Sequence, residues 1–111
     1  MSAITTHILD TARGRPARGV PLRLEVRSGG TTWTAIAQGV SDSDGRARLL
    51  ETVSGPGTYR LTFDTGAYFA TVGASAFYPE VQVVFEIVDA ASHHHVPLLL
   101  SPFGYSTYRG S

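Results

Sequence analysis

Apolar and polar side chains alternate along most of this chain, and short turns interrupt the alternation at frequent intervals. In the clearest case, Val20 to Arg27, every second residue is apolar and the residues between are mostly charged. Successive side chains of a strand point to opposite faces, so this pattern indicates a half-buried strand. No segment keeps the roughly 3.6-residue period of a long amphipathic helix. The sequence therefore predicts an all-β fold, a two-sheet antiparallel β-sandwich.

Eight strands are expected, which suits two packed sheets of four strands each. One short helix is expected at residues 65–72, because the apolar residues there lack strict alternation and Asp64 or Thr65 can cap it. No linker or internal repeat divides the chain, so residues 1–111 are expected to form a single domain. The predicted strands cover residues 3–9, 20–27, 32–38, 46–50, 58–63, 81–87, 93–100 and 103–109.

The composition excludes several classes of protein. Nine basic and nine acidic side chains balance, which argues against a nucleic acid or an anionic membrane as the main partner. The absence of cysteine leaves no disulfide framework and no thiolate site. No apolar run is long enough to span a bilayer, and the first residues lack the pattern of a signal peptide. We expect a cytoplasmic protein or, alternatively, the mature form of a periplasmic one.

The segment from His93 to Ser111 holds apolar and aromatic residues almost to its last position. Chain ends are usually frayed and polar, so this composition indicates a docked terminus. Residues 96–100 are apolar at nearly every position, and both faces of such a strand need cover. In a two-layer sandwich one face would meet water, so the segment predicts self-association.

Histidines provide the first candidate site residues. His7 lies in the middle of the first predicted strand, either as a half-buried structural residue or as a titratable group facing a cleft. His93, His94 and His95 are adjacent, so strand parity places His93 and His95 on one face and His94 on the other. A pair with this spacing can bind zinc, but no further ligands are evident and no metal is expected.

The other candidate site residues are arginines and the last residues of the sequence. Arg46 follows an Asp-Gly turn at the start of a strand, and Arg48 shares its face. Each is either a solvated side chain or a planar group for recognising carbonyl oxygens. Near the end of an ideal strand, Tyr108 would face away from Arg109 and Ser111, and Gly110 is expected to relax that constraint by bending the chain.

Two further kinds of active site find no support in the sequence. The G-x-S-x-G motif of a nucleophilic serine is absent, and the serines in turns have no evident histidine partner. The glycine-rich segments lack phosphate-loop spacing and are typical of turns.

The terminal segments also resemble a known family. HHHVPLLLSPFGYSTYRGS at residues 93–111 and TTHILDTARGRPARGVPLRL at residues 5–24 resemble the 5-hydroxyisourate hydrolases, the transthyretin-like enzymes of purine catabolism. DGRARLL, GTYRLTFDTGAYF and FYPEVQVVF extend the resemblance over nearly the whole chain. The resemblance implies a transthyretin-like β-sandwich with one short helix, and a homotetramer with active sites between subunits.

The resemblance also implies a reaction and a set of site residues. The expected substrate is 5-hydroxyisourate, a purine derivative, which would be hydrolysed to 2-oxo-4-hydroxy-4-carboxy-5-ureidoimidazoline without a cofactor. The alternative is a non-catalytic small-molecule carrier like transthyretin, because fold alone does not fix function. The implied catalytic residues are His7, Arg46, His95 and Ser111, and the implied substrate-binding residues are His7, Arg46, Tyr108 and Arg109.

Overall fold

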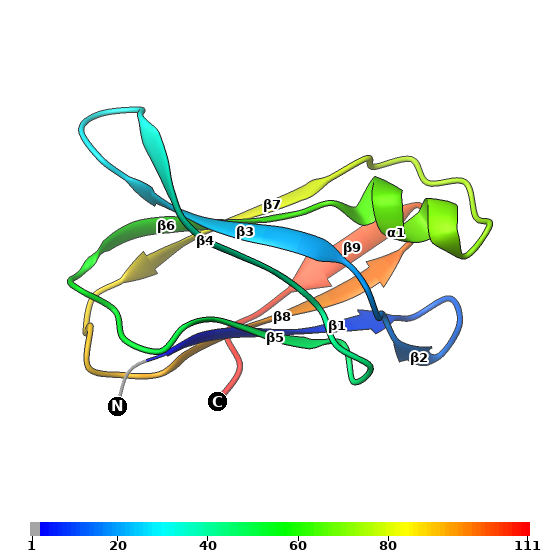
Figure 1. Ribbon diagram of the computed structural model, residues 1–111, viewed down its shortest axis with the longest axis horizontal. Coiled ribbons are helices and arrows are strands. Elements are labelled where there is room, and N and C mark those ends of the chain that lie inside the picture. Colours follow the sequence, from blue (N-terminus) through cyan, green and yellow to red (C-terminus); the bar gives the residue numbers. More distant parts are fainter. Residues whose placement is uncertain (1–2) are drawn as a thin grey trace.

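The computed structural model describes residues 3–111, which form two facing sheets and one short helix (Figure 1). Met1 and Ser2, part of the predicted domain of residues 1–111, lie outside the described residues. The first sheet contains β1 (Ile4–Asp10), β2 (Arg15–Pro16), β5 (Arg46–Leu50), β8 (His94–Ser101) and β9 (Gly104–Thr107). The second contains β3 (Pro21–Arg27), β4 (Trp33–Val40), β6 (Gly57–Phe63) and β7 (Val81–Ile87). The predicted all-β sandwich with one helix, α1 (Thr65–Thr71), is confirmed.

The strand count differs from the predicted eight because residues 15–16, expected to be loop, form the short β2 against the end of β1. The last predicted strand is also shorter than expected and ends at Thr107. Beyond Thr107 the chain returns to the sheet only through a single bridge between Gly110 and His95. The C-terminal segment is therefore docked, as predicted, but its last residues, 108–111, are held by this bridge and not by a strand.

In the first sheet, β1 pairs with β8 on one side and with β5 and β2 on the other, and β9 lies beyond β8. The β1–β8 pair departs from the predicted antiparallel arrangement, because these two strands run parallel while the other pairs of the two sheets are antiparallel. No hairpin joins β1 to β8, so nothing in the local chain forces them to run in opposite directions. The register places Thr5 opposite His95 and Asp10 opposite Leu100.

The core lies between the two sheets, and the parity predicted from the sequence decides which residues enter it. Along β1, Ile4, Thr6 and Ile8 are fully buried, while the residues between them are half-buried on the other face. Asp64 caps α1 through its side chain, which accepts a hydrogen bond from the Ala67 amide at 3.1 Å. The largest fully buried side chains include Leu24, Leu61, Phe63, Phe69 and Leu98.

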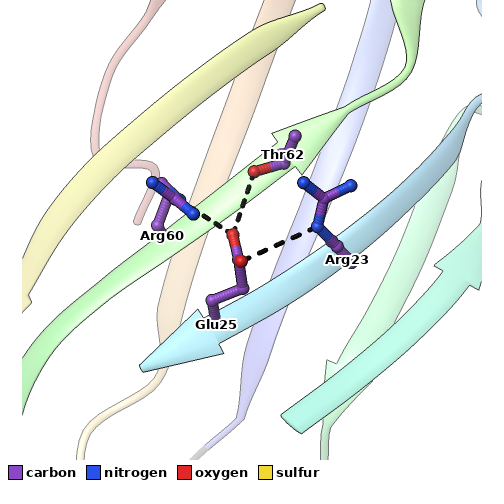
Figure 2. A network of polar contacts seen from close by, with 4 residues as sticks. All are labelled: Arg23, Glu25, Arg60 and Thr62. Carbon is purple, nitrogen blue, oxygen red and sulfur yellow. Dashed lines mark hydrogen bonds and ion pairs between the residues drawn. The ribbon is translucent and has the colours of Figure 1, made fainter. Parts of the chain in front are cut away.

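The outer face of the second sheet carries a buried charge (Figure 2). Glu25 lies on this face, as strand parity predicts, but only 7% of its surface is exposed because neighbouring side chains cover it. Arg60 donates to its carboxylate at 2.8 Å, Thr62 donates at 3.2 Å and Arg23 lies 3.7 Å away. The hydrogen bond from Arg60 is the main cause that lowers the pKa of Glu25, against the opposing effect of burial. Both oxygens of the buried carboxylate therefore have a hydrogen-bond or ion-pair partner.

Candidate functional site

The outer face of the first sheet brings together residues that are far apart in the sequence. His7 on β1 lies opposite Arg46 on β5 and opposite Pro97 on β8. Two residues earlier on β1, Thr5 lies opposite Arg48 and His95. Side chains of directly opposite residues lie on the same face of a sheet. Two imidazoles and a guanidinium of the predicted site therefore share one face across three neighbouring strands.

A cavity of about 510 Å³ opens on this face. Three of the four predicted catalytic residues, Arg46, His95 and Ser111, line it. His7 lies beside Arg46 in the sheet but outside the cavity lining. The rest of the lining includes Thr5, Asp42, Arg48 and His93.

A tight turn before β5 fixes the backbone position of Arg46, the first residue of that strand. The Asp42 carboxylate accepts hydrogen bonds from the amides of Asp44 and Arg46, both at 2.9 Å. Gly45 has a positive φ of 77°, and a Cβ there would lie 2.4 Å from the carbonyl oxygen of Ile8. Only glycine fits this close approach to β1. The Asp-Gly-Arg sequence thus anchors the backbone of Arg46, and its guanidinium makes no ion pair with any residue between positions 3 and 111.

The bridge at Gly110 brings the chain end to the cavity. The Gly110 amide donates to the carbonyl of His95 at 2.8 Å. A Cβ at Gly110 would lie 2.5 Å from Cδ2 of His95, so the imidazole occupies the space of the missing side chain. Gly110 therefore leaves room for the ring, and its φ is not positive. That it also bends the chain stays a prediction. Ser111 follows directly and lines the cavity.

A second cavity, of about 340 Å³, lies between β7 and the β8–β9 side of the first sheet. Tyr108 and Arg109, the two remaining predicted substrate-binding residues, line this second cavity. The side chain of Arg109 donates to the carbonyl of His93 at 3.3 Å. His95 lines both cavities and so lies between the two groups of predicted residues. Within one chain, Tyr108 and Arg109 do not share a wall with Arg46.

The half-buried imidazole of His95 sits in an environment that disfavours its charged form. Burial is the main cause that lowers its pKa, and the positive charges of His93 and Arg46 lower it further, with a smaller effect from His7. A neutral imidazole can accept a proton at one ring nitrogen. The surroundings of His95 therefore favour the neutral imidazole over the charged imidazolium.

His94 has a different environment from its two neighbours. It is buried, with 5% of its surface exposed, and its Nδ1 has no hydrogen-bond partner among residues 3–111. Burial is the main cause that lowers its pKa, and the charge of Arg109 adds to the effect. The predicted parity is confirmed: His94 points inward, while His93 and His95 are on the cavity side.

Two polar residues of this site were not predicted for the reaction: Thr5 was not singled out from the sequence, and His93 was considered only as half of a zinc-binding pair. The Thr5 hydroxyl lies 2.8 Å from Nδ1 of His95 and 2.9 Å from Nε2 of His93. Strand parity does place Thr5 on the face of His7. The parallel register that brings it to His95 leaves no local signal in the sequence.

Comparison with known proteins shows which family the chain resembles in sequence. The model of the HIUase/Transthyretin family matches residues 4–110. The 5-hydroxyisourate hydrolase of Mus musculus is 48% identical over 99% of this chain and 96% of that protein. That of Deinococcus radiodurans is 48% identical over 97% of this chain and 95% of that protein.

Solved structures agree with the fold. The 5-hydroxyisourate hydrolase of Klebsiella pneumoniae is similar with a TM-score of 0.86 and 38% identity, over 98% of this chain and 99% of that one. Sea bream transthyretin in complex with thyroxine gives a TM-score of 0.89 and 35% identity, over 96% and 93%. The fold and the family resemblance are confirmed, but backbone similarity extends to a hydrolase and a thyroxine-binding protein alike. Among residues 3–111, no helix has the length and apolar character needed to cross a membrane.

Proposed function

Because the chain belongs to the HIUase/transthyretin family, we propose that it is an enzyme of urate degradation that hydrolyses 5-hydroxyisourate to 2-oxo-4-hydroxy-4-carboxy-5-ureidoimidazoline. The names of the similar hydrolases support the activity. The observation that carries the proposal is the convergence of His95, Arg46 and Ser111 on one cavity. A carrier of an apolar hormone would not need an unpaired guanidinium beside a neutral imidazole.

In the proposed mechanism, His95 takes a proton from a water molecule, which attacks the carbonyl carbon of an amide-type bond in the six-membered ring. A C–O bond forms, the C–N bond breaks, and the departing nitrogen receives a proton from His7. The guanidinium of Arg46 stabilises the negative charge that develops on the carbonyl oxygen. A general base contributes about 10²–10⁴-fold, and an oxyanion donor about 10²–10³-fold. Ser111 orients the substrate.

We propose that the active protein is a homotetramer whose sites lie between subunits. Exposed aromatic and aliphatic side chains gather along the free edges of both sheets, where another copy could pair. His7, outside the cavity of its own chain, and Tyr108 and Arg109, around the second cavity, would then complete sites shared with another subunit. Sedimentation velocity tests this assembly, and a monomer at assay concentration would exclude it. The exposed edge residues include Val84, Phe103, Tyr105 and Tyr108.

The test of the activity is the ultraviolet decay of freshly prepared 5-hydroxyisourate. We expect the wild-type protein to accelerate the decay and His95→Ala to lose most of the acceleration. Arg27→Ala is the matched control, because Arg27 lies on the second sheet and stacks on Trp33, at 4.9 Å from the ring centroid. Decay at the spontaneous rate with folded wild-type protein would overturn the hydrolase and favour the carrier. Full activity of His95→Ala would overturn the site.

A further inference from the structure

The hydroxyl of Thr5 lies between two imidazoles and is within hydrogen-bond distance of both. Its Oγ1 is 2.8 Å from Nδ1 of His95 and 2.9 Å from Nε2 of His93. The two rings have centroids 6.3 Å apart, too far for a hydrogen bond between their nitrogens. Within residues 3–111, the Thr5 hydroxyl is the group that bridges them. We infer that Thr5 and His93 are positioning residues that set the tautomer of His95, and thereby decide whether Nε2, the ring nitrogen that Thr5 does not contact, can act as a base.

The inference follows from counting hydrogens. A threonine hydroxyl has one hydrogen to donate, and a neutral imidazole has one N–H and one lone pair. Thr5 therefore donates to one imidazole and accepts from the other. If His95 donates from Nδ1, Thr5 donates to Nε2 of His93, and Nε2 of His95 keeps a lone pair. If His93 donates from Nε2, Thr5 donates to Nδ1 of His95, and Nε2 of His95 carries the hydrogen.

The surroundings favour the first arrangement. Nε2 of His95 has no hydrogen-bond partner within residues 3–111, so Thr5 alone fixes this ring from inside the chain. The guanidinium groups of Arg46 and Arg48 line the same cavity, and positive charge favours a lone pair over an N–H at the nitrogen that Thr5 does not hold. This is the tautomer that the proposed water activation requires, so the consequence for catalysis rests on the proposed function.

Protonation of His93 would reverse the arrangement. The ring of His93 is exposed to solvent. Once its Nε2 carries a hydrogen it can only donate to Thr5, and Thr5 then donates to Nδ1 of His95. His95 must release its Nδ1 proton to solvent and take one at Nε2, so it stops being a base without becoming charged. The other charged or titratable groups around His95 are His7 on β1, Arg46 and Arg48 on β5 and Asp42 in the turn before β5. On the side of the second cavity they are Glu86 on β7, Tyr108 and Arg109.

The first test removes the bridge and reads the tautomer directly. Nitrogen NMR of the imidazoles in the full-length protein reports which ring nitrogen of His95 carries the hydrogen, whatever the enzyme's substrate. We expect Nδ1–H in the wild type, a shift towards Nε2–H in Thr5→Val, and the wild-type tautomer in Thr5→Ser. The kcat of Thr5→Val should fall on the order of 10²-fold, the scale of a misplaced catalytic group, and Thr5→Ser should restore most of it.

A control for this pair lies just after β1, against the other end of β8. Thr11 donates its hydroxyl to the carbonyl of Leu100 on β8 at 3.1 Å, beyond the far end of β1 from the cavity. Thr11→Val therefore removes a threonine hydroxyl from the same strand pair without touching either imidazole. It should leave the His95 tautomer and kcat unchanged. An equal loss of kcat in Thr5→Val and Thr11→Val would reduce Thr5 to a structural residue and overturn the inference.

The second test replaces His93, the other imidazole that contacts the Thr5 hydroxyl. His93→Lys always donates, so it should hold His95 in the Nε2–H tautomer and lower kcat at every pH. His93→Gln can accept from Thr5 and does not titrate, so it should keep kcat and extend activity to lower pH. If His93 acted only through its charge, which lowers the pKa of His95, His93→Gln would instead move the acid limit of activity to higher pH. That result would refute tautomer control.

The two proposals fail separately. An Nδ1–H tautomer that depends on Thr5 in a protein without hydrolase activity would support the inference and overturn the proposed function. Hydrolase activity with a His95 tautomer indifferent to Thr5→Val and His93→Lys would do the reverse.

Discussion

The outer faces of the two sheets carry two polar clusters built from similar side chains but arranged in opposite ways. On the second sheet, both carboxylate oxygens of Glu25 are in contact with Arg60, Thr62 or Arg23 (Figure 2). On the first sheet, Arg46 and His95 line a cavity, and the guanidinium of Arg46 has no ion pair within the described chain. Arg60 thus pairs with the carboxylate of its own cluster, whereas Arg46 faces a cavity where it can bind another molecule.

The difference teaches where each cluster contributes its free energy. A buried charge with satisfied partners stabilises the fold, and the loss of one partner leaves the other uncompensated. A cluster with unused donors and lone pairs gives little to stability but can interact with a bound molecule. Substitutions should therefore separate the two clusters, with activity lost at one and stability lost at the other.

The largest effect is expected for Arg46→Ala. Loss of the donor to the developing negative charge should lower kcat/KM by about 10²–10³-fold, or about 2.7–4 kcal/mol. The free energy of unfolding should stay within about 0.5 kcal/mol of the wild type, because the side chain is exposed and unpaired. Steady-state kinetics and urea denaturation measure the two quantities. A large loss in the free energy of unfolding would show that Arg46, like Glu25, stabilises the fold, and the proposed difference between the two clusters would be wrong.

Glu25→Ala should show the opposite behaviour. Removing the carboxylate leaves Arg60 without its partner, which should lower the free energy of unfolding by about 3 kcal/mol. This is the low end of the usual range, because 17% of the Arg60 side chain stays exposed. Urea denaturation measures the loss, and kcat should not change.

The matched control is the double variant Glu25→Leu with Arg60→Met, which removes both charges and keeps apolar volume. It should recover most of the stability. If the double variant is as unstable as Glu25→Ala, packing rather than the unpaired charge explains the loss.

Gly110→Ala should have an intermediate effect confined to the site. The new methyl group would meet Cδ2 of His95 at 2.5 Å, so the imidazole must move. A displaced base should lower kcat by about tenfold, less than its removal. The comparison is with Gly55→Ala, where a Cβ meets nothing within 4 Å. Equal kcat in both variants would show that the ring position is not critical.

The smallest effect concerns acid stability at His94. Its pKa is lowered by burial, so the unfolded chain binds a proton that the folded chain does not, and stability falls as the pH drops below the ordinary value of 6.5. His94→Leu removes this loss and the unpartnered Nδ1, and should stabilise the protein by about 1 kcal/mol at pH 5. Thermal unfolding at pH 5 and pH 8 measures the difference. The stability lost through Glu25, whose pKa is also lowered, should appear only as the pH falls below about 4.5 and should be unaffected by His94→Leu.

Local rules predicted much of the fold and the residue types of the site, and failed where distant segments meet. Alternation placed His7 and Thr5 on one face of β1, and His93, just before β8, on the same face as His95, because parity depends only on neighbouring residues. The parallel register that sets Thr5 opposite His95 depends on strands about ninety residues apart, and no short-range pattern encodes it. The role of Gly110 was missed for the same reason, since the atom that excludes a side chain there belongs to His95.

The parallel pairing of β1 with β8 also has a consequence for synthesis on the ribosome. β1 emerges early, yet one of its two hydrogen-bonding edges waits for residues 94–101, which are translated much later. Until then the nascent polypeptide displays an unpaired strand edge that chaperones or other chains can occupy. Long-range closure of this kind is slow. The pocket that contains His95 therefore forms only after residues 94–101 have been synthesised, when the strands of the opposite sheet are already available.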